Sequence, residues 1–201
     1  MYPVSGPVKQ VDVVTFTYEE IKDPNADLSA KIKEAFGTEG YGICIVQNVP
    51  GYLEKRAKLL PLATKVANLP KERLEKLEFP KNFYSIGWSH GKEKFFGKND
   101  YSKGSFYANP QYDNIYGDSY EAKEGDVFAP NVWPTEDVPE LENAFKDLGC
   151  LIVETGILLS KHIDDFIKRE VPTYEDGKIQ KIIKDSKCCK ARLLHYFPSE
   201  I

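Results

Sequence analysis

The sequence lacks the features that mark secreted, membrane-spanning and nucleic-acid-binding proteins. Its 201 residues carry 27 basic and 31 acidic side chains, a net charge of -4, and so have no basic excess of the kind that binds nucleic acid. The start, MYPVSGPVKQ, contains no apolar signal core, and no Asn-x-Ser/Thr sequon occurs. The longest apolar region, residues 149–160, is about half as long as a bilayer span and contains Glu154. We therefore expect a cytoplasmic protein that binds neither nucleic acid nor a membrane.

Cysteine and histidine are also scarce. The four cysteines include the vicinal pair Cys188 and Cys189, which fits poorly into a regular disulfide framework, so we expect a reducing compartment. A zinc site needs close pairs such as Cys-x-x-Cys, and two adjacent cysteines do not have that spacing. The histidines are His90, His162 and His195. An iron or zinc enzyme built from these three side chains is one alternative that the sequence leaves open.

One His-x-Asp motif occurs, HID at residues 162–164, and motifs of this kind supply ligands to non-haem iron. It falls in a predicted helix, where side chains two residues apart point about 200° away from each other. The two side chains therefore cannot close on one ion. We interpret the segment as a solvated helix face, with His162 and Asp165 near Lys161 and Lys168.

The first 50 residues predict a strand, a helix and a second strand. Residues 11–18 are β-branched and roughly alternating, as in a strand, and residues 25–36 have helical periodicity. The glycine-rich GTEGYG at 37–42 follows that helix instead of opening one, so it indicates a helix stop and not a phosphate-binding loop. Residues 41–50 then predict a buried strand that leaves through a Pro-Gly turn.

Helices predominate in the rest of the chain, and a strand closes it. We predict helices at 52–69, 70–78, 135–170 and 177–185, with Pro61 kinking or splitting the first. Residues 83–133 are rich in aromatic residues and glycine, which indicates loops and short strands ordered by aromatic packing. The final strand, at 190–197, presents Ala191, Leu193, His195 and Phe197 on one face, and Arg192, Leu194 and Tyr196 on the other.

The segment GWSHGKEKF at 87–95 is the best candidate for ligand binding. It holds Trp88, His90, Lys92 and Lys94 between glycines, which permit tight turns that present polar side chains to a small anionic ligand. We take Trp88, His90 and Lys94 as candidate substrate-binding residues. An aromatic-packed surface loop without a ligand is the alternative.

Several segments together resemble a known enzyme superfamily. DVVTFTYEEI, KIKEAFGTEGYGICIVQNVPGY and ANLPKERLEKL are similar, in this order, to the N-terminal region of the iron(II)- and 2-oxoglutarate-dependent oxygenases related to isopenicillin N synthase. NFYSIGWSHGKEKF, KGSFYANP and NVWP resemble an uncharacterised branch of the same superfamily. The closing ARLLHYFP is similar to the early core strand written in relatives as Arg-Leu-Asn-Tyr-Tyr-Pro-Pro. The resemblance runs along almost the whole chain.

This resemblance implies an α+β fold that is the N-terminal strand and helix layer of a double-stranded β-helix (jelly-roll) oxygenase, truncated as the core sheet begins. Residues 1–134 would form the N-terminal region with aromatic-rich loops. Residues 135–201 would form the long helix, the short helix and the first strand of an incomplete jelly-roll core. In the family, the iron ligands and the arginine that pairs with 2-oxoglutarate lie beyond the Tyr-Pro strand. The resemblance therefore assigns this chain no catalytic residue and no metal ligand.

The resemblance also implies cofactors and one cofactor-binding residue. Iron(II) and 2-oxoglutarate are expected in the complete protein, which would oxidise a small-molecule substrate with dioxygen, and neither is expected to bind this chain alone. Tyr196 matches the family tyrosine that hydrogen-bonds 2-oxoglutarate, whereas Leu194 stands where the family has asparagine. We expect the 201-residue chain by itself to be inactive.

A non-catalytic interaction or ligand-binding module is the alternative function. In that case the helical layer and aromatic loops bind a protein or a ligand, and an apolar surface stays exposed where further sheet would pack. A lone terminal strand needs partners, because a sheet usually requires three or more strands to be stable. Self-association through an exposed sheet edge is therefore an expected interaction.

Overall fold

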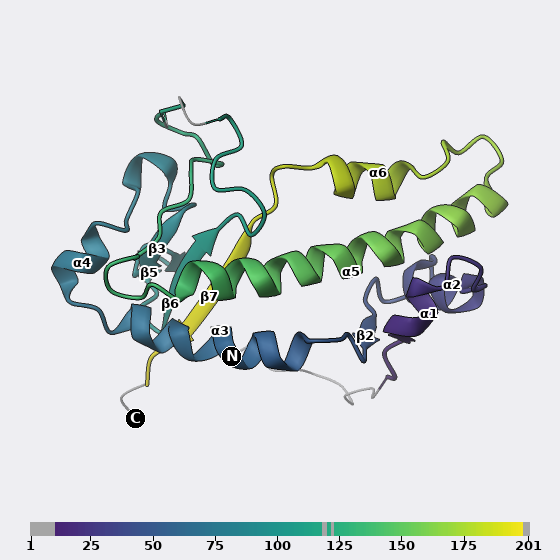
Figure 1. The fold of residues 1–201 in the computed structure, drawn as a ribbon, viewed down its shortest axis with the longest axis horizontal. Coiled ribbons are helices and arrows are strands. Elements are labelled where there is room, and N and C mark those ends of the chain that lie inside the picture. Colours follow the sequence, from purple (N-terminus) through teal and green to yellow (C-terminus); the bar gives the residue numbers. More distant parts are fainter. Residues whose placement is uncertain (1–10, 118–119, 122, 199–201) are drawn as a thin grey trace. The chain divides into compact units, whose positions relative to one another are not determined.

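The computed structural model describes residues 11–117, 120–121 and 123–198, which form a mixed α+β structure of helices and small sheets (Figure 1). The described sheets have two or three strands, and none of them closes into a jelly roll. Among the described residues, no helix is both long and apolar enough to cross a membrane. Residues 1–10, where we expect no signal core, lie outside the described part of the chain.

The chain divides into two compact units. One combines the residues up to Pro50 with Thr155–Ile182, and the other combines Gly51–Glu154 with the residues from Ile183 onward. The helix α5 (Leu141–Glu170) contributes its first half to the second unit and its second half to the first. The division into 1–134 and 135–201 that the oxygenase resemblance implies stays a prediction.

The first unit contains a parallel pair of short strands, β1 (Thr15–Thr17) and β2 (Ile45–Gln47). Two helices, α1 (Tyr18–Lys22) and α2 (Ser29–Phe36), lie between these strands in sequence. The core of the unit consists of Phe16, Ile21, Leu28 and Ile32, against which Leu158, Leu159, Ile163 and Phe166 of α5 pack. Helix α2 ends where the glycines predict, because Gly37 is its C-terminal cap.

The strand β2 is shorter and more exposed than the buried strand predicted over 41–50. Side chains of a strand alternate between its two faces, and here Cys44 and Val46 pack against the core. Ile43 and Ile45 remain 55% and 48% exposed, and Tyr41, before the bend at Gly42, is 64% exposed. The prediction of a buried strand is therefore wrong, because the described residues cover only one face of β2.

Helix α1 replaces the end of the strand predicted over 11–18. Thr17 is its N-terminal cap: the Thr17 hydroxyl accepts from the Glu20 backbone N–H at 3.2 Å, and Glu20 Oε2 accepts from the Thr17 backbone N–H at 2.7 Å. This reciprocal capping box satisfies two backbone donors that the first helical turn would otherwise leave unpaired. Lys31 Nζ of α2 donates to Glu20 Oε1 at 2.7 Å and so ties the two helices together.

The second unit packs helices against one face of a three-stranded antiparallel sheet (Figure 1). The strands are β3 (Gly87–His90), β6 (Lys103–Ala108) and β7 (Ala191–Tyr196), in the order β3-β6-β7. The covering helices are α3 (Tyr52–Ala67) and the first half of α5. The shared core includes Leu59, Leu62, Val66, Trp88, Phe106, Leu141, Phe145, Leu148 and Leu193.

Smaller elements complete the second unit. They are α4 (Lys71–Glu75), the 3-10 helix η1 (Pro80–Asn82), and a hairpin of β4 (Lys94–Phe95) and β5 (Lys98–Asn99). Short strands and loops therefore occupy most of the region from 83 to 133, as its composition predicts. The final strand predicted over 190–197 is confirmed as β7.

The structure differs from the predicted helices at two places near proline residues, Pro61 in α3 and Pro139 before α5. Helix α3 runs without a break through Pro61, since Pro61 and Ala57, whose carbonyl loses its helical donor, are both exposed and water can take that bond. Helix α5 begins at Leu141 and not at Thr135. Pro139 disfavours helical geometry at Val138, so the turn in which the Asp137 and Val138 N–H groups donate to the Pro134 carbonyl does not continue into α5.

Asp164 of α5 caps the helix α6 (Lys178–Asp185) from the side. Its carboxylate is 1% exposed. Oδ1 accepts from the Tyr174 hydroxyl at 2.5 Å and from the Ile179 N–H at 2.9 Å, and Oδ2 accepts from the Gln180 N–H at 2.8 Å. A negative charge at the start of a helix pairs its free N–H groups and complements the helix dipole. This one carboxylate therefore orders the segment that follows α5.

His162 does not lie on a solvated helix face, so that interpretation is wrong. Its ring is 2% exposed, and Nε2 lies 3.0 Å from the Ile21 carbonyl oxygen, a backbone acceptor at the end of α1. His162 and Asp164 bond different partners, the Ile21 carbonyl and the Ile179 N–H. Asp165 does lie on the outer side, where it pairs with Lys161 at 2.6 Å.

Removing the buried cap tests this account of the first unit. Asp164→Ala leaves one hydroxyl and two backbone N–H groups without their acceptor, and should lower the free energy of unfolding by about 2–4 kcal/mol. Asp165→Ala, one residue away, removes only a surface ion pair and should change it by less than about 0.5 kcal/mol. Urea unfolding followed by circular dichroism measures both. Equal losses for the two variants would contradict the capping role.

The capping box of α1 should make stability depend on pH in acid. The hydrogen bond from Lys31, followed by that from the Thr17 backbone, lowers the pKa of Glu20 from 4.5 to about 2. A carboxyl whose pKa is lower in the folded state stabilises that state above its unfolded pKa, and this contribution disappears as the pH falls. Wild type should therefore be more stable than Glu20→Gln at pH 7, and the difference should shrink between about pH 4.5 and 2. A difference in melting temperature that is constant across this range would refute the prediction.

Candidate functional site

The sheet β3-β6-β7 has one apolar and one polar face. Its register aligns Trp88, Phe106 and Leu193 across the three strands, and all three side chains are buried under the helices. Because side chains alternate along a strand, their neighbours point the other way. We call the opposite surface the polar face; it carries Ser89, Lys103, Ser105, Tyr107, Arg192, Leu194 and Tyr196.

A glycine in the central strand lets the apolar face pack closely. Gly104 stands opposite His90 on one side and His195 on the other. A Cβ at Gly104 would lie 2.2 Å from Cη2 of Trp88, so the indole ring occupies the space that any other residue would need. The ring thereby covers the backbone of β6 from the core side. The opposite side of the same strand is left to the polar groups.

Arg192 is held in a defined orientation on the polar face. Its Nε and Nη2 donate to Ser105 Oγ at 3.0 and 2.7 Å, and Nη2 also donates to Glu93 Oε1 at 2.8 Å. The guanidinium carbon lies 5.1 Å from the centre of the Tyr107 ring, where a cation–π contact adds to the hydrogen bonds. Ser105 is 2% exposed and sits on the central strand, so it anchors the guanidinium to a rigid element.

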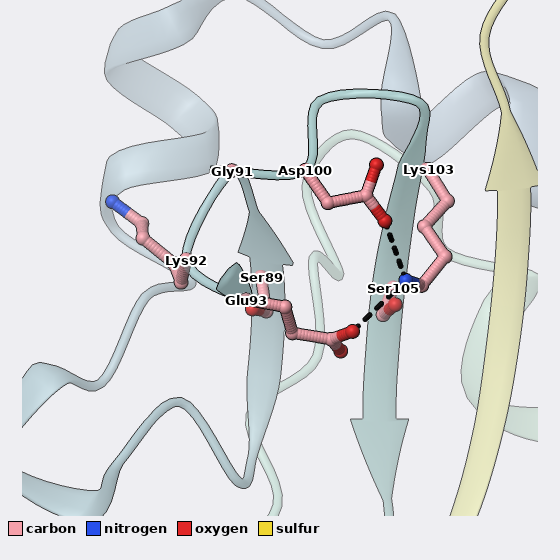
Figure 2. Close-up of a pocket in the computed structure, with 7 residues that line it drawn as sticks. All are labelled: Ser89, Gly91, Lys92, Glu93, Asp100, Lys103 and Ser105. Carbon is pink, nitrogen blue, oxygen red and sulfur yellow. Dashed lines mark hydrogen bonds and ion pairs between the residues drawn. The ribbon is translucent and has the colours of Figure 1, made fainter. Parts of the chain in front are cut away.

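Lys103 joins two carboxylates next to Arg192. Its Nζ lies 2.9 Å from Glu93 Oε2 and 2.6 Å from Asp100 Oδ2, and Figure 2 shows both contacts converging on the lysine. The Tyr107 hydroxyl adds a long contact of 3.4 Å to Glu93 Oε1. Glu93 thus receives donors from three side chains of the sheet, Arg192, Lys103 and Tyr107. The cavity beside Glu93, Asp100, Lys103 and Ser105 measures about 10 Å³, room for about one water molecule.

These contacts shift the ionisation of the network. The hydrogen bond from Lys103 lowers the pKa of Glu93 against the opposing effect of burial, and the charge of Arg192 lowers it further. Hydrogen bonds to Asp100 and Glu93 raise the pKa of Lys103. Lys103 likewise lowers the pKa of Asp100, together with the hydroxyl and N–H of Ser102. Lys103 is therefore positive, and Glu93 and Asp100 are negative, at neutral pH. Together with the permanently charged guanidinium of Arg192, the network holds two positive and two negative charges.

The structure places the residues predicted from GWSHGKEKF and from the closing strand on different surfaces. Trp88 is 2% exposed in the core, and His90 lies on the same apolar face, with its ring 4.6 Å from that of Phe197. Lys94 is exposed on β4, outside the three-stranded sheet. Tyr196 is 66% exposed on the polar face, opposite Lys103. Ligand binding by these four residues stays a prediction, and no surface contains all of them.

The histidines do not form a metal site within the described part of the chain. The rings of His90 and His195 both contact Phe197, with centroids 4.6 and 4.8 Å from it. His195 Nδ1 lies 3.3 Å from the Thr64 hydroxyl, and His90 Nε2 lies 3.1 Å from the Tyr101 carbonyl. No group of three or more His, Cys, Asp or Glu side chains in the described ranges could hold a metal ion.

The sequence contains only part of the signal for the polar network. The alternation of Lys103, Ser105 and Tyr107 in KGSFYA is the pattern of a strand with one polar face, although sequence reasoning did not single it out. The alternation of the closing strand predicts that Arg192 and Tyr196 share one face, and both lie on the polar face. No local pattern indicates that Glu93 would meet Arg192, because the two are 99 residues apart.

Comparison with known proteins adds no assignment. No protein-family model matches the chain, and no curated protein sequence matches it significantly. The resemblance to the oxygenases therefore rests on the sequence segments quoted above.

The close packing at Gly104 predicts a strong response to a single methyl group. Gly104→Ala forces Trp88 to move and should cost about 1–3 kcal/mol of unfolding free energy, with an altered near-UV circular dichroism spectrum. Gly156→Ala is the matched control: its Cβ meets nothing within 4 Å, and alanine in a helix should stabilise by about 0.5–1 kcal/mol. Urea unfolding should therefore show a lower unfolding free energy for Gly104→Ala and a higher one for Gly156→Ala. A neutral Gly104→Ala would show that the sheet and Trp88 separate easily.

Proposed function

We propose that this chain is the N-terminal part of an iron(II)- and 2-oxoglutarate-dependent oxygenase that oxidises a small molecule with dioxygen. In this proposal β7 is the first strand of a jelly-roll core, and the polar face of β3-β6-β7 is one wall of the substrate pocket. The proposal combines the sequence resemblance with the arrangement of the second unit.

The observation that carries the proposal is the register of β7 on β6. This register places Arg192, Leu194 and Tyr196 on the face that the helices leave uncovered. The strand that resembles the Arg-Leu-Asn-Tyr-Tyr-Pro segment thus turns its Tyr196 hydroxyl away from the core. Tyr196 can there donate a hydrogen bond to a bound carboxylate such as that of 2-oxoglutarate.

The described residues do not fit iron, because they contain no cluster of three or more His, Cys, Asp or Glu side chains that could hold a metal ion. The proposal therefore requires the iron ligands, and the arginine that pairs with 2-oxoglutarate, to come from residues outside the described part of the chain. Leu194 offers no polar group where the family has asparagine, so Tyr196 would be the one family contact to 2-oxoglutarate from this strand. No reaction step can be assigned to this chain's own residues beyond binding and orientation.

An interaction module is the second candidate function, and a separate observation favours it. Tyr41, Ile43 and Ile45 are exposed apolar side chains in and just before β2, in a unit whose described sheet has two strands. Two-stranded sheets are marginally stable alone, and exposed apolar side chains that lie together commonly mark interaction surfaces. A second copy of this chain, pairing through β2, is the partner that fits such an edge.

The mass of the native polypeptide distinguishes the two functions. An antibody against residues 1–201 should detect a species in the source cells that is much heavier than 22.8 kDa, because the oxygenase needs further residues for iron. The purified 201-residue chain should convert no 2-oxoglutarate to succinate when iron(II) is added. Intact mass spectrometry and a succinate assay provide the two measurements.

A native species at 22.8 kDa would overturn the oxygenase proposal in favour of the interaction module. Succinate production by the 201-residue chain would also contradict the proposal, because it would require an iron site among residues that show none.

A further inference from the structure

We propose that Arg192, Lys103 and Ser105 form a binding subsite for a monoanionic carboxylate, and that Glu93 occupies this subsite from within the chain. A ligand carboxylate would exchange with the Glu93 side chain. The inference rests on the proposed function in one respect, which is that it takes the polar face as a wall of the substrate pocket and so makes the ligand a substrate carboxylate.

The donors of the subsite stand on rigid strands and are already arranged around a carboxylate. Arg192 and Lys103 donate to different oxygens of Glu93, at 2.8 and 2.9 Å, and so contact it from two sides. Ser105 fixes the guanidinium from behind through two hydrogen bonds. An arginine held in this way, with a lysine beside it, is a preorganised acceptor site for any carboxylate that reaches the same position.

Glu93 belongs to a much less firmly held segment. It precedes the hairpin of β4 and β5, whose strands have two residues each, and no residue from 92 to 99 is buried. At the tip, Phe96 is 90% exposed and has a positive φ of 49°. Segments with few buried apolar contacts open at low free-energy cost, so the hairpin can carry Glu93 away while the sheet stays folded.

The contacts that hold the hairpin are mostly polar and are close to Glu93 itself. Lys103 contacts Glu93 and also lies 4.9 Å from the centre of the Phe95 ring. The Asp100 N–H donates to the Glu93 carbonyl at 2.8 Å, and Asn99 Nδ2 donates to the Gly91 carbonyl at 2.9 Å. An incoming carboxylate that takes over Lys103 and Arg192 therefore removes the main side-chain attachment of Glu93.

The charge of the subsite selects the class of ligand. When Glu93 leaves, Arg192 and Lys103 contribute two positive charges and Asp100, still 2.6 Å from Lys103, contributes one negative charge. The remaining charge of one positive unit matches a carboxylate better than a doubly charged phosphate. Lys92, the other nearby cation, is paired with Glu78 at 2.9 Å and is not available. The cavity seen in Figure 2 is too small for a ligand while Glu93 stays in place.

Chemical rescue by acetate tests the subsite without iron or 2-oxoglutarate. Glu93→Ala removes the internal carboxylate and should lower the melting temperature of the 201-residue chain. Sodium acetate, compared with sodium chloride at equal ionic strength and pH 7, should restore it in a saturable way, by about 3–6 °C at ten times the dissociation constant. Wild type should show a much smaller rise, because Glu93 competes with acetate.

Two control variants make the result specific. Glu93→Ala combined with Arg192→Met should lose the acetate response, since the main donor is gone. Glu140→Ala removes the carboxylate from a surface ion pair with Lys65 in the same unit and should not respond to acetate. Equal responses of all variants, or no saturation up to the solubility limit of acetate, would overturn the inference.

Every other outcome is also decisive. If Glu93→Ala is unfolded at 25 °C, saturable recovery of the folded signal on adding acetate supports the subsite, and a failure to recover refutes it. Saturable rescue together with a native mass of 22.8 kDa would keep the carboxylate subsite and reject the oxygenase. Absence of rescue together with a heavier native protein would reject the carboxylate subsite and keep the oxygenase proposal.

Discussion

The packing of Trp88 against Gly104 is the contact on which the organisation of the second unit depends. It brings the indole into line with Phe106 and Leu193, and these three side chains are buried under α3 and α5. A shift of one residue in any of the three strands would turn these apolar side chains to solvent and the charged ones into the core. The burial of three large side chains therefore sets the position of every polar group on the opposite face.

The polar face shows what such a fixed register makes available to chemistry. Arg192 and Lys103 need no further ordering to meet an anion, because Ser105, Asp100 and the strands already hold them. In the folded chain their charges are balanced by Glu93 and Asp100, so the surface carries no net charge that would attract ions indiscriminately. A ligand that binds this face has to replace the carboxylate of Glu93. The ligand must therefore carry a single negative charge and present a carboxylate.

The His-x-Asp segment illustrates why residue types alone do not identify a site. Histidine and aspartate serve as metal ligands, but the same atoms also satisfy backbone groups that would otherwise be buried without partners. His162 meets a carbonyl at the end of α1, and Asp164 meets N–H groups at the start of α6. The helical spacing of the two residues predicted that they would not share an ion. It was not sufficient to predict burial, because burial depends on how α1 and α6 pack against α5.

The sequence by itself determined the elements whose cause is local. The alternation in ARLLHYF, the glycines after α2 and the periodicity of α6 each act within a few residues, and the expected strand, helix stop and helix are present. At Thr17 two local signals compete: the β-branched run favours a continued strand, whereas the capping box starts a helix, and the helix forms. Tertiary structure alone decided which face of β2 is covered, which carboxylate meets Arg192 and what Asp164 binds. Asp164 binds Tyr174 and Ile179, 10 and 15 positions away, and Glu93 meets Arg192, 99 positions away. Such pairings exist only after the burial of apolar faces has chosen one register among many that local propensity allows equally.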